Sequence, residues 1–406
     1  MARALDPTAI AAPTRRTLPA LCLGSFITTL AFAAPAPFFP AISDEMDVSV
    51  ALLGQITAAM MVLSAPLALV VGPLADRHGP RRFILAGLAT AAVALFDFAL
   101  APVFALLFIA SVAGAISEAT VPGLSLAIAG TRFEGPAARR AIGWTVGALA
   151  SAPIIGVPIL TTIGDIAGWR VAFLVAGCGA AAVAVLVAAW LPDTARTDDA
   201  PLRWSGIVAA YRPLLRDGDM RRLYACTLTR SMSWMGMLTY FGAVMKTQYG
   251  LSTSGIGIAF MLAGTGYFGG SLIAGGPLAR LPARPLVAVS NVTLAVSILI
   301  VVAGLVSTPV AMVLLVVAAF AGAVGWVGLS SMLTTETPAG VGTTMVLNSS
   351  LLNLGAAAGA GLGGLLLATG GYGALAIGLP LFGLISAALV WTSRGPSTSS
   401  VAAPAD

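Results

Sequence analysis

The chain has 406 residues, of which 58% are hydrophobic and 9% are charged. No soluble domain of this size needs so much apolar surface, so the composition excludes a soluble protein and indicates a chain embedded in a bilayer. The net charge of +5 does not indicate nucleic-acid binding, because the basic residues sit in alternate short polar breaks.

Apolar runs long enough to cross a bilayer recur along almost the whole chain. A spanning helix needs about 20 apolar residues. The runs predict six helices in each half, at residues 17–42, 50–75, 81–102, 103–130, 140–164, 170–191, 222–247, 254–280, 284–306, 308–333, 341–369 and 371–393. We therefore predict an all-α membrane protein with twelve transmembrane helices.

The distribution of arginine predicts how these helices are oriented. Short cytoplasmic loops hold an excess of Lys and Arg. If the N-terminus is inside, eighteen of the 21 Lys and Arg residues fall in cytoplasmic segments, and only Arg170 and Lys246 face outside. We expect a multi-pass protein of the cell inner (cytoplasmic) membrane with both termini in the cytoplasm.

An internal repeat divides the chain into two halves. The loop after the second predicted helix reads GPLADRHGPRR from Gly72, and the loop after the eighth reads GPLARLPARP from Gly276, 204 residues later. Two similar six-helix units with a substrate site between them are a known transporter arrangement. We predict two pseudo-symmetric bundles, residues 1–192 and 222–406, joined by a cytoplasmic linker at 193–221.

The first of these loops resembles a family signature. Its pattern G-x-L-a-D-r-x-G-r-r is that of the major facilitator superfamily, and the matching positions are Gly72, Leu74, Asp76, Arg77, Gly79 and Arg81. Gly168-Trp169-Arg170 at the start of the sixth helix also resembles the family, and Leu347–Gly364 is similar to the eleventh helix of its sugar, purine and drug efflux members, so the resemblance covers essentially the whole chain. It implies a secondary transporter with Gly72, Asp76, Arg77, Gly79 and Arg81 in or beside a cytoplasmic gate. The alternative for this loop is a topology anchor without a switching role.

Ionisable residues within the predicted spans are candidates for function, because burying each costs about 3 kcal/mol or more. Glu118 lies near the middle of the fourth helix, about 20 Å from either end. A carboxyl there can take a proton from one side and release it to the other, so we predict that Glu118 carries the coupling proton. A neutral packing role and direct binding of a cationic substrate are the alternatives. Asp97, near the outer end of the third helix, is a further candidate that can reach water.

The fifth helix carries a partial match to the antiporter signature G-x-x-x-G-P-x-x-G-G of exporting members. Pro153 and Gly156 are kept, whereas Ala148, Ala152 and Val157 replace the other glycines. Pro153 is expected to bend the helix, and the small residues to allow a tight contact that seals the cavity against proton leak. Generic kinking is the alternative. The arginine that exporters carry on the fourth helix is replaced by Ala110.

The second half supplies one more buried charge and part of a cavity wall. Arg230 lies about 12 Å inward from Arg222 on the seventh helix. It either snorkels to the cytoplasmic face or pairs in the cavity with Glu118 or an anionic substrate. Candidate cavity residues, on helices that line the cavity in the resembling family, are Phe26, Thr29, Phe32, Trp234, Tyr240, Trp326, Asn348 and Asn353.

These features predict a proton-coupled exporter, an antiporter, of a small organic molecule such as a drug or metabolite. The alternative is a proton-coupled uptake symporter for a small organic anion or sugar. Cys22, Cys178 and Cys226 lie in apolar runs, His78 is alone and the chain has no phosphate-binding loop, so we expect no enzyme activity, no cofactor and no metal site. The expected partners are the small-molecule substrate, protons and the lipid bilayer, and we expect a monomer.

Overall fold

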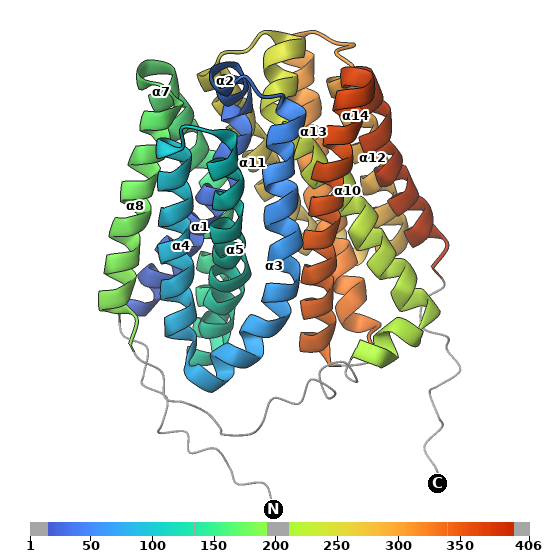
Figure 1. Cartoon of the computed structure of the whole chain (residues 1–406). Coiled ribbons are helices and arrows are strands. Elements are labelled where there is room, and N and C mark those ends of the chain that lie inside the picture. Colours follow the sequence, from blue (N-terminus) through green and yellow to red (C-terminus); the bar gives the residue numbers. More distant parts are fainter. Residues whose placement is uncertain (1–14, 134, 193–210, 339, 394–406) are drawn as a thin grey trace, which may run out of the picture.

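Figure 1 shows a bundle of long helices joined by short connections in this computed structural model, which describes residues 15–133, 135–192, 211–338 and 340–393. The first half contains α1 (Thr17–Ala33), α2 (Pro35–Met46), α3 (Val50–His78), α4 (Pro80–Leu100), α5 (Phe104–Arg132), α6 (Gly135–Ser151), a π-helical turn η2 (Ala152–Gly156), α7 (Val157–Ala167) and α8 (Trp169–Trp190). The second half contains α10 (Gly218–Tyr249), α11 (Thr253–Gly275), a 3₁₀ turn η3 (Pro277–Arg280), α12 (Ala283–Val302), α13 (Thr308–Thr335) and α14 (Val341–Trp391).

Some membrane crossings are made of more than one helical segment. Pro35 has no N–H to continue the ladder of α1, and the chain bends there before α2 completes the first crossing. Pro153 stands in η2, which joins α6 to α7 within a single crossing. The described part of the predicted linker 193–221 is short, and α10 begins at Gly218, where the Asp217 side chain accepts hydrogen bonds from the amides of Asp219 and Met220 at 2.9 and 2.8 Å.

The described helices provide twelve crossings, as predicted. Ten segments qualify by length and composition, and the last of them, Thr343–Trp391, has 49 residues, about twice the length of one crossing. It bends at Gly371, whose φ of 62° lies in the left-handed region that favours glycine. The twelfth crossing is α10, which is 32 residues long but carries several charged residues, so composition alone does not select it.

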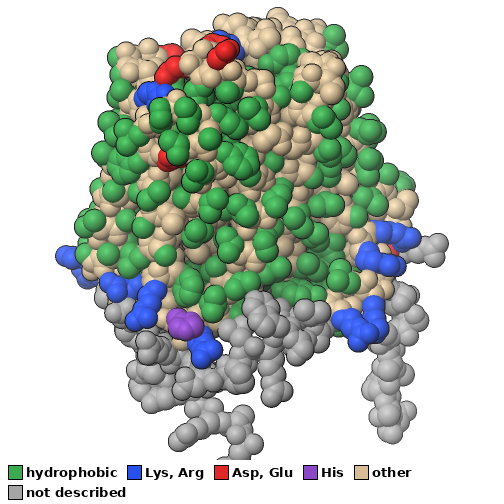
Figure 2. All heavy atoms as spheres, in the orientation of Figure 1, with side chains coloured by type: hydrophobic (Ala, Val, Ile, Leu, Met, Phe, Trp, Pro, Cys, Tyr) green, Lys and Arg blue, Asp and Glu red, His purple; other side chains and the backbone are tan. Residues whose placement is uncertain are grey.

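Charged side chains separate the two ends of the bundle (Figure 2). Lys and Arg gather at the end where α1 begins and α14 ends, which we call the arginine-rich end. Asp44, Glu45, Asp47 and Asp165 lie at the opposite end, which we call the acid-rich end. The two basic residues at the acid-rich end are both paired, Arg170 with Glu45 at 2.7 Å and Lys246 with Asp44 at 2.8 Å.

The Gly168-Trp169-Arg170 segment ties three helices together at the acid-rich end. Gly168, with φ of 89°, makes the turn into α8. The Trp169 ring N–H donates to Glu45 at 2.5 Å, and Arg170 donates to the carbonyl oxygens of Ala99 and Ala101 at 3.1 and 2.9 Å. This network fixes α2, α4 and α8 within the first half.

The two halves contact each other through pairs of helices, one from each half. α3 packs against α14, α7 against α11, and α2 against α10. A methyl group added at Gly242 of α10 would lie 2.3 Å from the carbonyl oxygen of Ala36 in α2, and one added at Gly257 of α11 would overlap Thr161 of α7. Glycine at these positions lets the helices of the two halves approach closely and leaves no room for a side chain.

Polar contacts close the same end. The Lys246–Asp44 ion pair joins α10 to α2, and the backbone amide of Ser254 donates to Asp165 at 2.8 Å, which joins the start of α11 to α7. These ion-pair and backbone contacts add to the close helix contacts at Gly242 and Gly257. The described structure is therefore closed at the acid-rich end.

Candidate functional site

Glu118 is placed at mid-membrane by α5 and faces away from lipid. It stands 14 residues before Arg132, the last residue of α5, or about 21 Å from the arginine-rich end. Ile109, which is 61% exposed on the lipid-facing side, precedes it by nine residues, which corresponds to about 180° around a helix. The carboxyl is half-buried and makes no hydrogen bond or ion pair to a described residue.

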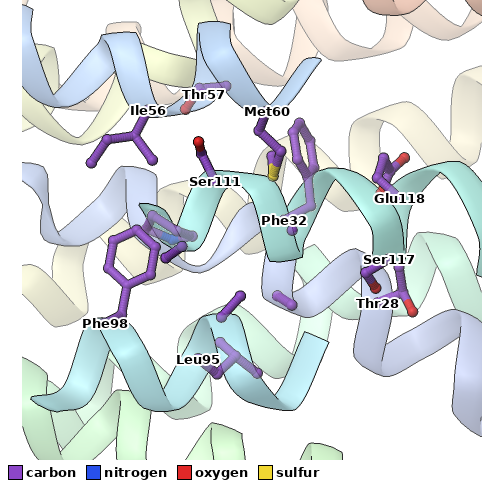
Figure 3. A pocket seen from close by; sticks show the side chains of 15 residues that line it. Thr28, Phe32, Ile56, Thr57, Met60, Leu95, Phe98, Ser111, Ser117 and Glu118 are labelled. Atoms are coloured by element: carbon purple, nitrogen blue, oxygen red, sulfur yellow. The ribbon is translucent and has the colours of Figure 1, made fainter. Parts of the chain in front are cut away.

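Glu118 lines a small cavity within the first half (Figure 3). The cavity has a volume of about 30 Å³, which is room for one or two water molecules. Its walls come from α1, α3, α4 and α5, and Glu118 is the one charged side chain among the described residues that line it. Figure 3 shows Ser117 directed toward Thr28 of α1, and Met60 and Phe32 on the other side of α5.

Gly114 brings α3 close to α5 one helical turn from Glu118. A methyl group at Gly114 would lie 2.6 Å from the Met60 sulfur. A larger residue would therefore displace Met60 from the wall that it forms beside the carboxyl.

A second cavity lies between the halves and adjoins the first. It is lined by residues of α1, α2 and α3 in the first half and of α10 and α11 in the second, among them Met235, Leu238 and Phe260. Phe32 and Thr57 line both cavities. The wall of this second cavity is apolar and partly aromatic with few polar groups, which suits a moderately apolar ligand.

Arg230 is turned into the second half. It is 4% exposed and donates through Nη2 to the carbonyl oxygen of Gly322 in α13. A methyl group at Gly325 would lie 3.3 Å from its Nε and 3.2 Å from Asn291 Oδ1, so the guanidinium lies among α10, α12 and α13. The structure does not bring Arg230 into an ion pair with Glu118.

Several predicted cavity residues make packing contacts in this conformation. Trp234 stacks on Tyr267 with ring centroids 6.4 Å apart, and Tyr240 is fully buried and donates to the Ala360 carbonyl oxygen at 2.5 Å. Asn348 accepts from Thr227 at 2.7 Å within the second half. Their role as substrate ligands stays a prediction.

Asn353 and Phe32 lie at the contact between the halves, and the remaining predicted residues lie within one half. Asn353 of α14 donates to Ser64 of α3 at 3.2 Å across the halves. Phe32 lines both cavities, whereas Trp326 and Thr29 are half-buried, with the Thr29 hydroxyl donating to the Ser25 carbonyl oxygen at 3.0 Å. Asp97, near the end of α4, has one carboxylate oxygen that is buried without a described partner.

The predicted gate residues lie where α3 passes into α4. Gly79, with φ of 89°, makes the turn between the two helices. Arg81 donates to the carbonyl oxygen of Ala188 in α8 at 2.7 Å, and Gly72 and Arg77 are half-buried on α3. The side chain of Asp76 lies outside the described part of the chain.

The predicted antiporter segment touches both halves. A methyl group at Gly156 would lie 2.7 Å from Leu30 and 3.1 Å from Phe26, both on α1. Ile154 packs against Gly264 of α11 in the other half, where a methyl group would lie 2.6 Å from it. A single π-helical turn in a long helix is frequent at functional sites, and this one stands where α1 and α11 meet the fifth crossing.

The prediction missed the residues of α1, α3 and α5 that complete the cavity. Thr28, Thr57, Met60 and Ser117 all line it. A signal was available, because Ser111, Gly114 and Glu118 are spaced three and four residues apart and so share one face of α5. Serine and glycine are ordinary in membrane helices, and their spacing alone does not show which neighbour they face.

Comparison with known proteins gives the family context. The model of the family described as Major Facilitator Superfamily matches residues 21–252 and 223–406. The uncharacterized MFS-type transporter YceJ of Bacillus subtilis (strain 168) is 26% identical over 238 residues, which span 59% of this chain and 60% of that protein.

Solved structures share the fold. A POT family transporter in complex with 5-aminolevulinic acid superposes with a TM-score of 0.77 at 14% identity, covering 94% of this chain and 98% of that one. The nucleoside transporter NupG gives 0.75 at 13% identity, covering 92% and 98%. The human organic anion transporter MFSD10 gives 0.67 at 21% identity, covering 94% and 100%. At these identities the likeness concerns the fold.

Proposed function

Because the chain belongs to the major facilitator superfamily, we propose that it is a secondary transporter that exports a small organic molecule in exchange for protons. The observation that carries the proposal is Glu118, a carboxyl at mid-membrane without a described partner, at a cavity that adjoins the contact between the halves. An uncompensated carboxylate in that position is costly, so binding of a proton or of a ligand there stabilises the site. If the proton and the ligand exclude each other at this carboxyl, the protein exchanges one for the other across the membrane.

The fifth crossing supports the direction of transport. Its π-helical turn at Pro153 packs against α1 through Gly156 and against α11 through Ile154. This contact obstructs leakage of protons between the halves, which an exporter driven by protons needs. The position of Arg230, bonded to Gly322 inside the second half, favours export over uptake of an organic anion, because that alternative requires its charge in the cavity.

We further propose that the arginine-rich end faces the cytoplasm of the inner membrane, so that the described conformation faces inward. The excess of arginine at that end supports this orientation. Green fluorescent protein fused after Thr392 is expected to fluoresce, and alkaline phosphatase fused after Pro102, in the α4–α5 connection, is expected to be active. The reverse pair of results would contradict the orientation.

The direction in which ligand affinity changes with pH distinguishes antiport from symport. A compound identified by a thermal-stabilisation screen of organic cations, anions and neutral molecules is expected to stabilise the purified protein more strongly as pH rises. If ligand and proton exclude each other, the affinity rises by up to about tenfold per pH unit while the site is protonated. A symporter, which binds both together, gives the opposite sign. Glu118→Gln is expected to make the affinity independent of pH, and affinity that falls as pH rises would reject antiport.

A further inference from the structure

The seam between α1 and α5 contains buried hydroxyl groups that have no hydrogen-bond partner among the described residues. They are Ser25 and Thr28 on α1 and Ser117 and Ser125 on α5, each at most 3% exposed. A buried hydroxyl in a protein is nearly always hydrogen-bonded, and an unmade bond is costly. In membrane helices such a hydroxyl can bond to its own backbone one turn earlier, as Thr29 and Thr120 do here. Four exceptions on one pair of helices call for an explanation.

The two helices are in contact along this seam. A methyl group at Gly24 of α1 would lie 3.6 Å from a methyl carbon of Val121 in α5, which is an ordinary packing distance. Val121 stands one turn from Ser117 on one side and one turn from Ser125 on the other, so the three follow one face of α5. Thr28 and Ser117 line the same cavity as Glu118, and Figure 3 shows them next to each other.

The hydroxyls are arranged by depth. Counting at 1.5 Å per residue, Ser125 and Ser25 lie about 10 and 12 Å from the arginine-rich ends of α5 and α1, and Thr28 and Ser117 lie about 16 and 22 Å from them. Glu118 lies at the level of the deeper pair. The series therefore runs from near the arginine-rich end to the carboxyl.

We propose that this seam holds water molecules and forms the proton path to Glu118, separate from the route of the substrate between the halves. The inference rests on the proposed proton exchange at Glu118 and adds to it how the proton leaves Glu118 toward the arginine-rich end. The cavity beside Ser117, Thr28 and Glu118 has room for one or two waters. Each hydroxyl donates one hydrogen bond and accepts others, so it passes a proton on by accepting one from a water and donating its own to the next.

Charged groups around the path act on the proton in opposite directions. Glu118 is the charged group at its inner end, and the described walls from α1, α3 and α4 add no other charge. Arg132, which is 7% exposed, ends the same face of α5 at the arginine-rich end. Its fixed positive charge disfavours a proton resting in the seam, so a proton released by Glu118 passes on to the water at that end.

The test compares two modes of transport in vesicles that contain the full-length protein. Thr28→Val and Ser117→Ala remove the hydroxyls while keeping side-chain volume nearly constant. The double variant is expected to lower proton-driven transport of the screened compound at least about tenfold. Exchange of labelled for unlabelled compound without a proton gradient is expected to stay within about twofold of the wild type, because the substrate route is unchanged.

Controls separate the hydroxyl function from structural damage. Thr120→Val, on the same helix but outside the cavity, is expected to leave both modes intact because the Thr120 hydroxyl already donates to the Ile116 carbonyl oxygen at 2.7 Å. Thr28→Ser, a single variant that keeps the hydroxyl, is expected to retain proton-driven transport. If the double variant transports like the wild type while Glu118→Gln loses coupling, the proton path is wrong and the exchange proposal stands. If Glu118→Gln also keeps coupling, the exchange proposal itself fails.

Discussion

Replacing Gly242 with valine is expected to stop transport by preventing closure of the acid-rich end. The added β-carbon would lie 2.3 Å from the Ala36 carbonyl oxygen and 2.8 Å from the Pro37 α-carbon. Both atoms belong to the backbone of α2, which Glu45 ties to Trp169 and Arg170 of α8, so neither can move aside as a flexible side chain would. Overpacking of this kind costs about 1–3 kcal/mol, which shifts a two-state equilibrium about 5- to 150-fold. We expect that shift to favour a state open at the acid-rich end.

The measurement is the distance between two spin labels, one at Val48 in the first half and one at Leu251 in the second, both at the acid-rich end. The labels are attached in a variant without the native cysteines. The distance is expected to lengthen in Gly242→Val and to stay short in Gly269→Val, because a side chain at Gly269 meets no atom within 4 Å. Gly359→Ala, which would clash with the Met232 backbone inside the second half, is expected to lower thermal stability instead. Unchanged label distances in active Gly242→Val would contradict the account of closure.

Much of the fold could be predicted from the sequence because the bilayer imposes a direct rule on it. An apolar run of about 20 residues must be a helix, since lipid offers the backbone no hydrogen bonds. The residues at which helices begin and end were harder to predict. α10 begins at Gly218 rather than near residue 222 because Asp217 caps it, and the predicted helices 341–369 and 371–393 form one bent helix that turns at Gly371.

The candidate site could be predicted only in part, because side-chain direction depends on which helices become neighbours. Glu118 was recognisable from its depth and charge alone. Tyr240 and Asn348 look like cavity residues in sequence, yet in this conformation they bond within the second half, to Ala360 and Thr227. Thr28 and Ser117 gave no signal, since a hydroxyl in a membrane helix is usually satisfied by its own backbone.

Glu118→Gln is expected to abolish proton-driven accumulation, while ligand exchange persists at compound concentrations high enough to offset weaker binding to the uncharged side chain. Glutamine keeps the size of the side chain but cannot take up or release a proton. The ionised carboxylate would hold its proton or ligand through a charge-assisted interaction, and losing that interaction corresponds to about 1.5–3 kcal/mol, or roughly 10- to 100-fold in the coupled rate. Glu118→Asp, which keeps the carboxyl but draws it back from the cavity, is expected to retain part of the coupling.

The most direct test of proton exchange at Glu118 is uptake of the screened compound into inverted vesicles with an acidic interior. Vesicles with the wild-type protein are expected to accumulate the compound against its gradient and to lose it when the proton gradient is collapsed. Glu118→Gln vesicles are expected to equilibrate the compound without accumulating it. Accumulation by Glu118→Gln equal to that of the wild type would show that this carboxyl does not couple transport to protons.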